Sequence, residues 1–324
     1  MGIKFEFLKA GNGDCILIST SEGTNILIDG GLTSTYDDIK TKLRTKKTLD
    51  LVVLTHVDND HICGLIALLR KSEENRKKIN TLWFNSFESI YVDDESTDNI
   101  GASQGILFEK LIQKYKHILH KGDIYLRDSK EMNIYSIKQD IKLILLSPLK
   151  CDLEKFKIDW QEDKEKMKAK FCNGRRSENI SSSYKDTDSS INNRTSIAFI
   201  FKYREDNYLF LGDAHIDVIN DSLQELGYSK TNRLKLKFVK LSHHGSEKNI
   251  NRTFLDLIDC QQFVILTNGT KFNHPSKCTL ELIYKYQDEK EIEFLFNYED
   301  YYREKLSTED EKKYNFKAKY RRNL

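Results

Sequence analysis

Hydrophobic runs separated by short turns dominate the start of the chain. Residues 3–8 alternate apolar and polar positions, which is the two-residue period of a half-buried strand. Continuous aliphatic runs at residues 15–18, 25–28 and 51–54 predict buried strands, and a Glu22-Gly23 turn makes two of them a hairpin. The pattern therefore predicts strands that pair closely within one sheet.

Helical spacing appears between and after these strands. Residues 37–47 predict an amphipathic helix with acidic residues in its first turn and lysines at its end. Residues 106–120 predict a second helix from the spacing of their apolar positions, with His117 and His120 as a solvated pair on one face.

The second half of the chain returns to strands after a polar interruption. Ten Lys and Arg and nine Asp and Glu fall within residues 150–190, so we expect a solvated insertion there. The remaining predicted strands are residues 141–147, 195–201, 207–213, 234–241 and 263–266.

Composition agrees with a globular protein that could form one large or two small domains. The 324 residues are 39% hydrophobic and 31% charged, with a net charge of +2. No apolar run approaches the ~18–20 residues that a membrane span needs, and the first residues enter a strand without room for a signal peptide. Six scattered cysteines show no metal or disulfide spacing. We therefore expect a cytoplasmic protein that contacts no membrane.

The segment after the strand at residues 51–54 concentrates candidate metal ligands. His56, Asp58, Asp60 and His61 lie at a turn between this strand and a helix-like run that follows Gly64. Side chains at such a turn converge on one point, and imidazole with carboxylate suits divalent metals. A polar loop with capping or solvated histidines is the alternative, which would suffice for a single histidine.

Later strands also end in polar residues. Asp213 follows a glycine at the end of a predicted strand, and the strand at residues 234–241 leads into His243 and His244. His274 follows the last predicted strand, just before a proline.

Together these motifs resemble the metallo-β-lactamase fold. The loop reads HxDxDH, with Asp58 at the place of the second histidine of the usual HxHxDH signature. With the GxGD turn at residues 11–14, the DGG turn at 29–31, HHGS at 243–246 and HPS at 274–276, it is most similar to the soluble nuclease domain of ComEC-type DNA-uptake proteins.

The resemblance implies an α/β fold, an αββα sandwich with metals at one edge. It suggests a single domain over residues 1–300, with polar insertions at about 71–135 and 150–190. Residues 301–324 would form a basic, polar C-terminal segment.

It also implies a ligand set for two divalent metal ions, manganese or zinc. One position would take His56, Asp58 and Asp213, and the other Asp60, His61, Asp213 and one of His243 and His244. The imidazole that the family usually adds between the loop and the bridging aspartate is absent, because residues 121–214 contain no histidine. Its place is taken by Asn192 and Asn193, so oxygen ligands would favour manganese.

Supporting residues follow from the same resemblance. Asp29 would hold the metal loop from behind, although a simple turn residue before two glycines is the alternative. Asp14 and Asn193 are further candidates for residues that support the ligands, while His215 more plausibly caps a helix.

The implied activity is that of a phosphodiesterase, most plausibly a nuclease acting on DNA. A hydroxide bridging the two metals would attack phosphorus, with Asp60 orienting it and His274 donating a proton to the leaving oxygen. His274 is equally consistent with a residue that only begins a helix. Nucleic acid would be the substrate partner, and protein partners stay open.

Basic residues near the HHGS motif bear on the substrate. Lys235, Lys237 and Lys240 could contact a phosphate backbone, or strand alternation could place Lys235 and Lys237 on an outer face, remote from the site. A hydrolase of small esters, lactones, thioesters or a cyclic nucleotide is one alternative function. An inactive binding module is another, and the complete second ligand set argues against it.

Overall fold

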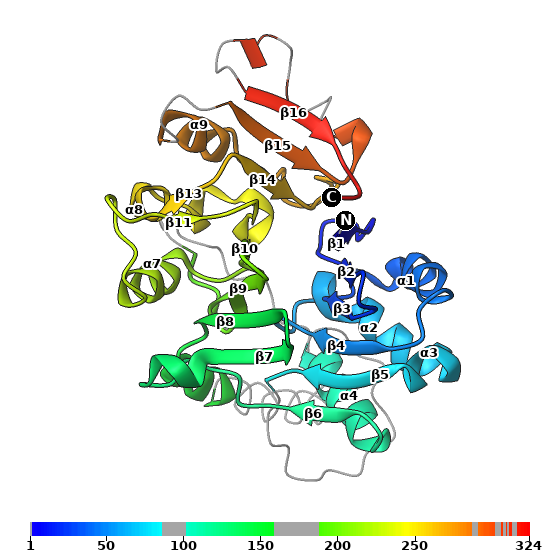
Figure 1. Ribbon diagram of the computed structural model, residues 1–324. Coiled ribbons are helices and arrows are strands. Elements are labelled where there is room, and N and C mark those ends of the chain that lie inside the picture. The colour runs from blue at the N-terminus through cyan, green and yellow to red at the C-terminus, as the bar shows by residue number, and fades with distance from the viewer. Residues whose placement is uncertain are drawn as a thin grey trace, which may run out of the picture.

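Two β-sheets packed face to face form the centre of the molecule. The computed structural model describes residues 2–85, 102–158, 188–286, 291–301, 306, 309, 311–312 and 316–324. In this described part, one sheet has six strands, β1 (Ile3–Phe7), β2 (Ile16–Thr20), β3 (Asn25–Ile28), β4 (Leu49–Val53), β5 (Ile79–Trp83) and β6 (Leu119–Lys121). Strands β1 to β3 pair antiparallel and β3 to β6 pair parallel (Figure 1).

The second sheet is formed by the later part of the chain. Its order is β16-β15-β14-β12-β10-β9-β8-β7. The strands are β7 (Ile134–Lys138), β8 (Ile141–Ser147), β9 (Ala198–Tyr203), β10 (Asp206–Phe210), β12 (Val239–Lys240), β14 (Gln262–Ile265), β15 (Ile292–Phe296) and β16 (Phe316–Tyr320). Short strands β11 (Leu234–Lys235) and β13 (Ile258–Asp259) pair separately.

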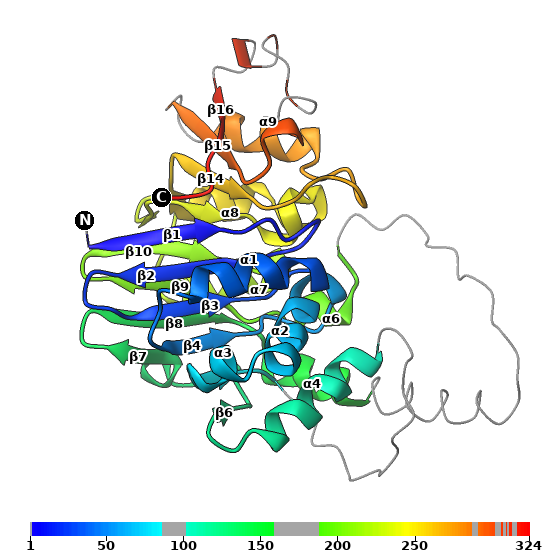
Figure 2. The same ribbon diagram turned by 90° about the vertical axis from the view of Figure 1, so that its right-hand side faces the viewer.

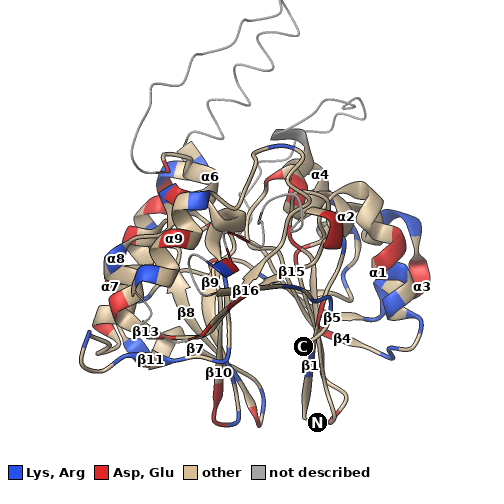
Figure 3. Ribbon diagram, turned by 90° about the horizontal axis from the view of Figure 1, so that it is seen from above, with Lys and Arg blue, Asp and Glu red and all other residues tan. Residues whose placement is uncertain are grey.

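Helices cover the outer face of each sheet, so the predicted αββα sandwich is confirmed (Figures 2 and 3). Those of the first half are α1 (Tyr36–Leu43), α2 (Asn59–Lys71), α3 (Glu73–Lys77) and α4 (Ala102–Lys114). Those of the second half are α6 (Ile191–Arg194), α7 (Ile216–Glu225), α8 (Arg252–Leu257) and α9 (Lys277–Tyr286). Short 3-10 turns are η1 (Thr33–Thr35), η2 (Lys130–Asn133), η3 (Ser242–Gly245) and η4 (Glu247–Asn249).

Aromatic side chains fill the space between the sheets. Phe5 of β1 packs against Tyr208 and Phe238 of the other half, with ring centroids 4.6 and 4.9 Å apart. Alternation along β1 sends Phe5 and Phe7 into this layer, while the buried Glu6 faces α1 and accepts a hydrogen bond from Lys42. The predicted period of this strand is therefore confirmed.

Some predicted elements differ from the structure. The helix predicted over residues 106–120 ends at Lys114, because Leu119 and His120 pair with β5 in the sheet. The strand predicted over 234–241 is split into β11 and β12. Part of the basic, polar C-terminal segment forms β16 and then hydrogen-bonds to β1, with Phe5 N donating to Leu324 O.

Large parts of the two predicted insertions, residues 86–101 and 159–187, lie outside the described residues. Of the six cysteines, the five described ones are free thiols, and Cys172 lies outside that part. No described helix has both the length and the apolar character that crossing a bilayer requires.

The turn after β3 is held directly against the first turn of α2. Gly30 N donates to His61 O and Gly64 N donates to Gly31 O, at 2.7 and 3.0 Å. A methyl group on Gly64 would lie 1.9 Å from Gly30 O, so this close approach needs glycine. The contact fixes where α2 begins relative to the sheet, and with it the loop before α2.

We expect Gly64→Ala to destabilise the protein by roughly 1–3 kcal/mol, because the added methyl forces the turn and the helix apart. Denaturant unfolding would measure the loss. Arg70→Ala, on an exposed position of the same helix, is the control and should change stability by less than about 0.5 kcal/mol. Equal stability of Gly64→Ala and wild type would contradict the role of this contact.

Candidate metal centre

Three strand ends bring the candidate ligands to one edge of the sandwich. His56 and Asp58 lie in the loop after β4, and Asp60 and His61 lie in the first turn of α2. Asp213 follows β10 after Gly212, and the two histidines of η3 follow β12, which pairs parallel with β10. Because β10 and β12 run in the same direction, their ends meet at this edge.

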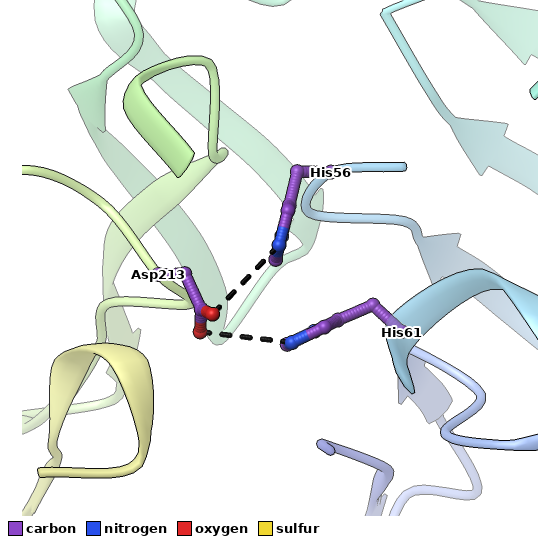
Figure 4. A group of neighbouring side chains, drawn as sticks. All are labelled: His56, His61 and Asp213. Carbon is purple, nitrogen blue, oxygen red and sulfur yellow. Dashed lines mark ion pairs between the residues drawn. The ribbon is translucent and has the colours of Figure 1, made fainter. Parts of the chain in front are cut away.

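The Asp213 carboxylate lies at the centre of four imidazole rings. Its oxygens lie 3.6 Å from Nε2 of His61, 3.8 Å from Nε2 of both His56 and His244, and 3.9 Å from Nε2 of His243. Figure 4 shows His56 and His61 directed at the two oxygens of Asp213 from separate elements. Both members of the HHGS pair therefore face Asp213, where the sequence left the choice between them open.

Hydrogen bonds on the far side of the rings fix which nitrogen faces Asp213. Nδ1 of His244 lies 2.8 Å from Leu266 O, and a carbonyl can only accept, so Nδ1 carries the hydrogen. Nδ1 of His61 likewise donates to Asp29 Oδ2 at 2.8 Å. In its neutral form each ring then has a lone pair on Nε2 directed inward, as in a metal-ligating histidine.

The same reasoning applies to His56 through Thr55. The Thr55 hydroxyl donates to Asp29 Oδ2 at 2.8 Å, so its oxygen accepts from Nδ1 of His56 at 3.1 Å. Asp29 also accepts from Thr55 N at 2.7 Å and is fully buried. One carboxylate behind the loop thus orients two of the inward-facing rings.

His243 is turned toward Asp213 by its backbone and by a carboxylate that the sequence did not single out. Both His243 and His244 have positive φ, 45° and 56°. Nδ1 of His243 lies 3.2 Å from Asp188 Oδ2, so it donates there and leaves Nε2 for the cluster. Asn193 Nδ2 donates to the same carboxylate oxygen at 2.8 Å.

The two loop carboxylates lie on either side of this cluster. Asp58 Oδ2 lies 3.8 Å from Nε2 of His56, and Asp58 Oδ1 accepts from Asn192 Nδ2 at 2.9 Å. Asp60 Oδ2 lies 3.8 Å from Nε2 of His244. Asn12 Nδ2 donates to the same Asp60 oxygen.

These donor atoms fit divalent metal ions. Among the described buried polar atoms without a hydrogen-bond partner are Nε2 of His56, His61 and His244 and Oδ1 of Asp213. Such atoms are costly unless a ligand satisfies them. Ligand atoms of His56, His61 and Asp213 lie within 4.8 Å of one another, as do those of Asp60, His61 and His244.

Opposite charges keep the central carboxylate ionised. Burial opposes ionisation of Asp213, but His61, His244 and His243 outweigh it and hold the pKa of Asp213 well below its usual value. Burial, together with the neighbouring His61, lowers the pKa of His56. Burial also opposes protonation of His61, yet Asp213 and Asp29 raise the pKa of His61 well above its usual value.

A buried lysine contributes a fixed positive charge to the same place. Lys240 is 1% exposed, forms an ion pair with Asp14, and donates to Gly212 O at 3.1 Å. Its Nζ is 4.0 Å from Asp213 Oδ1. Burial opposes ionisation of Asp14, but Lys240 and His244 lower the pKa of Asp14 to about 2.

The three basic residues predicted to contact the substrate lie in different environments. Lys240 is enclosed in the core on a central strand, so it cannot reach a phosphate backbone. Lys237 forms an ion pair with Asp206 at the start of β10, the end opposite the ligands. Lys235 lies in β11, which is in the lower part of Figure 3. Helix α6, which lies beside the ligands, is at the top of the same view. Lys235 and Lys237 are exposed, as the outer-face alternative expects, whereas Lys240 is buried.

His215 and His274 lie near the cluster in different ways. Arg194 Nη1 donates to Nδ1 of His215 at 3.2 Å, so His215 has its proton on Nε2, facing Asp188 at 3.6 Å, and is not available as a ligand. The ring centroid of His274 lies 5.5 Å from that of His243, at the rim.

Two supporting residues were missed from the sequence. Asp188 lies in the stretch interpreted as a polar insertion, and no local pattern marks it. Ser196 Oγ accepts from Asp213 N at 3.0 Å and lies 3.2 Å from Nδ1 of His56, but a lone serine at a strand start gives no signal.

Comparisons with known proteins agree with this architecture. The family model of the metallo-beta-lactamase superfamily matches residues 8–128, which include the loop with His56 and His61. No curated protein matches the chain significantly. The resemblance to ComEC-type nuclease domains rests on the motifs alone.

Solved structures share the fold at low identity. The chain is similar to the metallo-beta-lactamase fold protein YhfI from Bacillus subtilis, with 11% identity and a TM-score of 0.50 over 100% of this chain and 99% of that one. It is also similar to a diphosphatase of the PhnP family (11% identity, TM-score 0.46, 100% and 97% covered). A third structure is zinc-bound PqqB from Methylobacterium extorquens, with 9% identity and a TM-score of 0.47 over 99% of each chain. Residues 8–128 thus match the family model of the metallo-beta-lactamase superfamily, and the chain as a whole has the αββα fold.

Proposed function

We propose that the chain is a metal-dependent hydrolase of phosphodiester bonds, with nucleic acid as its substrate. The observation that carries the proposal is the set of four inward-facing imidazole nitrogens around the buried Asp213 carboxylate. Buried polar atoms of a protein core normally have hydrogen-bond partners. Several unpaired nitrogens directed at one point therefore support a ligand site.

The ligands divide into two positions that share Asp213. His56, Asp58 and His243 would hold one ion, and Asp60, His61 and His244 the other. His243 would then supply the imidazole that no residue between 121 and 214 provides, which weakens the argument for manganese over zinc.

Two divalent ions held there would neutralise phosphoryl charge and lower the pKa of an attacking water. The chain's own groups would complete the reaction. Asp60, held by Asn12, would orient the water and accept its proton. His274 at the rim would donate a proton to the leaving oxygen.

Phosphodiesters are the substrate class that this pairing suits best. Two ions that share one carboxylate can contact both the attacking and the leaving oxygen of an in-line displacement. The HxDxDH and HHGS motifs, which resemble those of ComEC-type nuclease domains, support nucleic acid within that class.

The first test concerns metal content. We expect about two divalent ions per wild-type chain, and loss of both in Asp213→Ala, because Asp213 serves both positions. Activity should fall on the order of 10³-fold or more. Metal analysis of the purified protein and hydrolysis after chelation and refilling with manganese or zinc would measure this. Asp221→Asn, an exposed carboxylate on α7, is the matched control. Full metal content in Asp213→Ala would exclude this site.

The second test concerns the buried pair below the site. Lys240→Met should destabilise the protein by roughly 3–5 kcal/mol, because it leaves the Asp14 carboxylate buried without its partner. Adding Asp14→Asn should recover much of that loss, and a double-mutant cycle from denaturant unfolding would measure the coupling. Additive losses would show that the two charges do not depend on each other.

The third test concerns the substrate. We expect the metal-loaded protein to hydrolyse single- or double-stranded DNA or a small reporter phosphodiester, assayed beside lactone and thioester substrates. Lys235 and Lys237 lie far from the ligands. The double substitution Lys235→Gln with Lys237→Gln should therefore leave the salt dependence of DNA binding unchanged. A protein that cleaves lactones or thioesters but no phosphodiester would refute the proposed function.

A further inference from the structure

An exposed aromatic ring lies at the rim of the metal centre. Phe272, in the loop between β14 and α9, is 49% exposed. Its ring stacks on His274, with centroids 5.9 Å apart and planes at 27°. It also meets His243 edge to face, at 6.4 Å and 77°. One imidazole ring therefore separates the Phe272 side chain from the Asp213 carboxylate.

The loop that carries this ring is tied down at both ends. Before Phe272, Asn268 N donates to Gly11 O at 2.9 Å. After it, Ser276 N donates to Gly245 O at 3.0 Å, and the Tyr301 hydroxyl donates to His274 O. Gly245 belongs to the same HHGS turn that orients His243. The aromatic ring is thus held at a fixed place relative to the candidate ligands.

A large apolar ring exposed at this place offers apolar area that a bound group could bury favourably. The other strongly exposed large apolar residues of the described part lie in other segments of the chain, at Leu119, Met132, Ile134 and Ile158. Lys271 Nζ lies over the Phe272 ring, 4.6 Å from its centroid, which places a mobile cation at the ring. An aromatic face next to a cation suits a flat, π-bearing group attached to an anion.

We propose that Phe272, supported by His274, is the stacking platform for a nucleobase next to the scissile phosphate, with Lys271 beside the adjoining phosphate. Stacking on aromatic rings is how proteins bind unpaired bases with little sequence preference. A paired base has both faces covered in the duplex, so the platform selects single-stranded substrate. The inference rests on the proposed function and adds a substrate class to it.

The experiment compares a single-stranded oligonucleotide with the same backbone lacking its bases. Wild-type kcat/KM should favour the base-bearing strand, and Phe272→Ala should reduce that preference roughly fivefold to a hundredfold. Phe272→Trp should keep it, because the indole still stacks. Leu119→Ala, which changes another exposed large apolar residue on β6, is the control. If Phe272→Ala lowered kcat/KM equally for the strands with and without bases, or did not lower it at all, the platform would be overturned.

A binding measurement separates this inference from the proposed function. Calorimetric titration of the metal-loaded protein with dAMP and with 2-deoxyribose 5-phosphate requires no hydrolysis. We expect tighter binding of dAMP, and loss of the difference in Phe272→Ala. Equal affinity of the wild type for both ligands would refute the platform, including the case in which the exposed ring is covered by a protein partner. Absence of phosphodiester hydrolysis with intact dAMP preference would instead refute only the proposed function.

Discussion

Burial of carboxyl groups is the constraint on which this structure depends. Asp213, Asp29 and Asp14 are all buried at one edge of the sandwich, and Asp60 is nearly so. Charge removed from water must be compensated nearby. Lys240 supplies one permanent cation, and the imidazole rings supply directed nitrogens. Polar atoms that still lack a hydrogen-bond partner make this edge of the sandwich a candidate ligand site.

The fold meets this constraint with backbone contacts that need little side-chain volume. The glycine turn after β3 touches the first turn of α2, and Asp29 next to it receives hydrogen bonds from the loop backbone, a hydroxyl and an imidazole. The orientation of His56 and His61 thus follows from one turn. His243 and His244 depend instead on left-handed backbone and on partners from other elements, Asp188 and Leu266.

Sequence patterns predicted the structural features that depend on a single short segment of the chain. The strand ends and the HxDxDH loop follow from runs of apolar residues that stop at polar ones. The αββα layering was implied by the resemblance to the metallo-β-lactamase fold, and it is confirmed. Lys240 could not be assigned from alternation, because a short strand between β10 and β14 has core on both faces. The end of α4 was misplaced because pairing of Leu119 and His120 with β5 overrides helical spacing. Asp188 was not predicted because the candidate ligand that it orients, His243, is 55 positions away in the sequence.

The two halves of the ligand set come from opposite sheets, and this bears on how the protein folds. Ser196 meets His56 across 140 positions of sequence, and Gly11 N meets the Tyr298 hydroxyl across 287. Contacts this remote are slow to form, because the intervening chain must first be ordered. A cation would therefore find its full set of ligands only in the docked native state, and binding would stabilise that state by mass action without nucleating it. Chelation would accordingly lower the equilibrium stability chiefly by speeding unfolding, while the rate of chain collapse stayed the same.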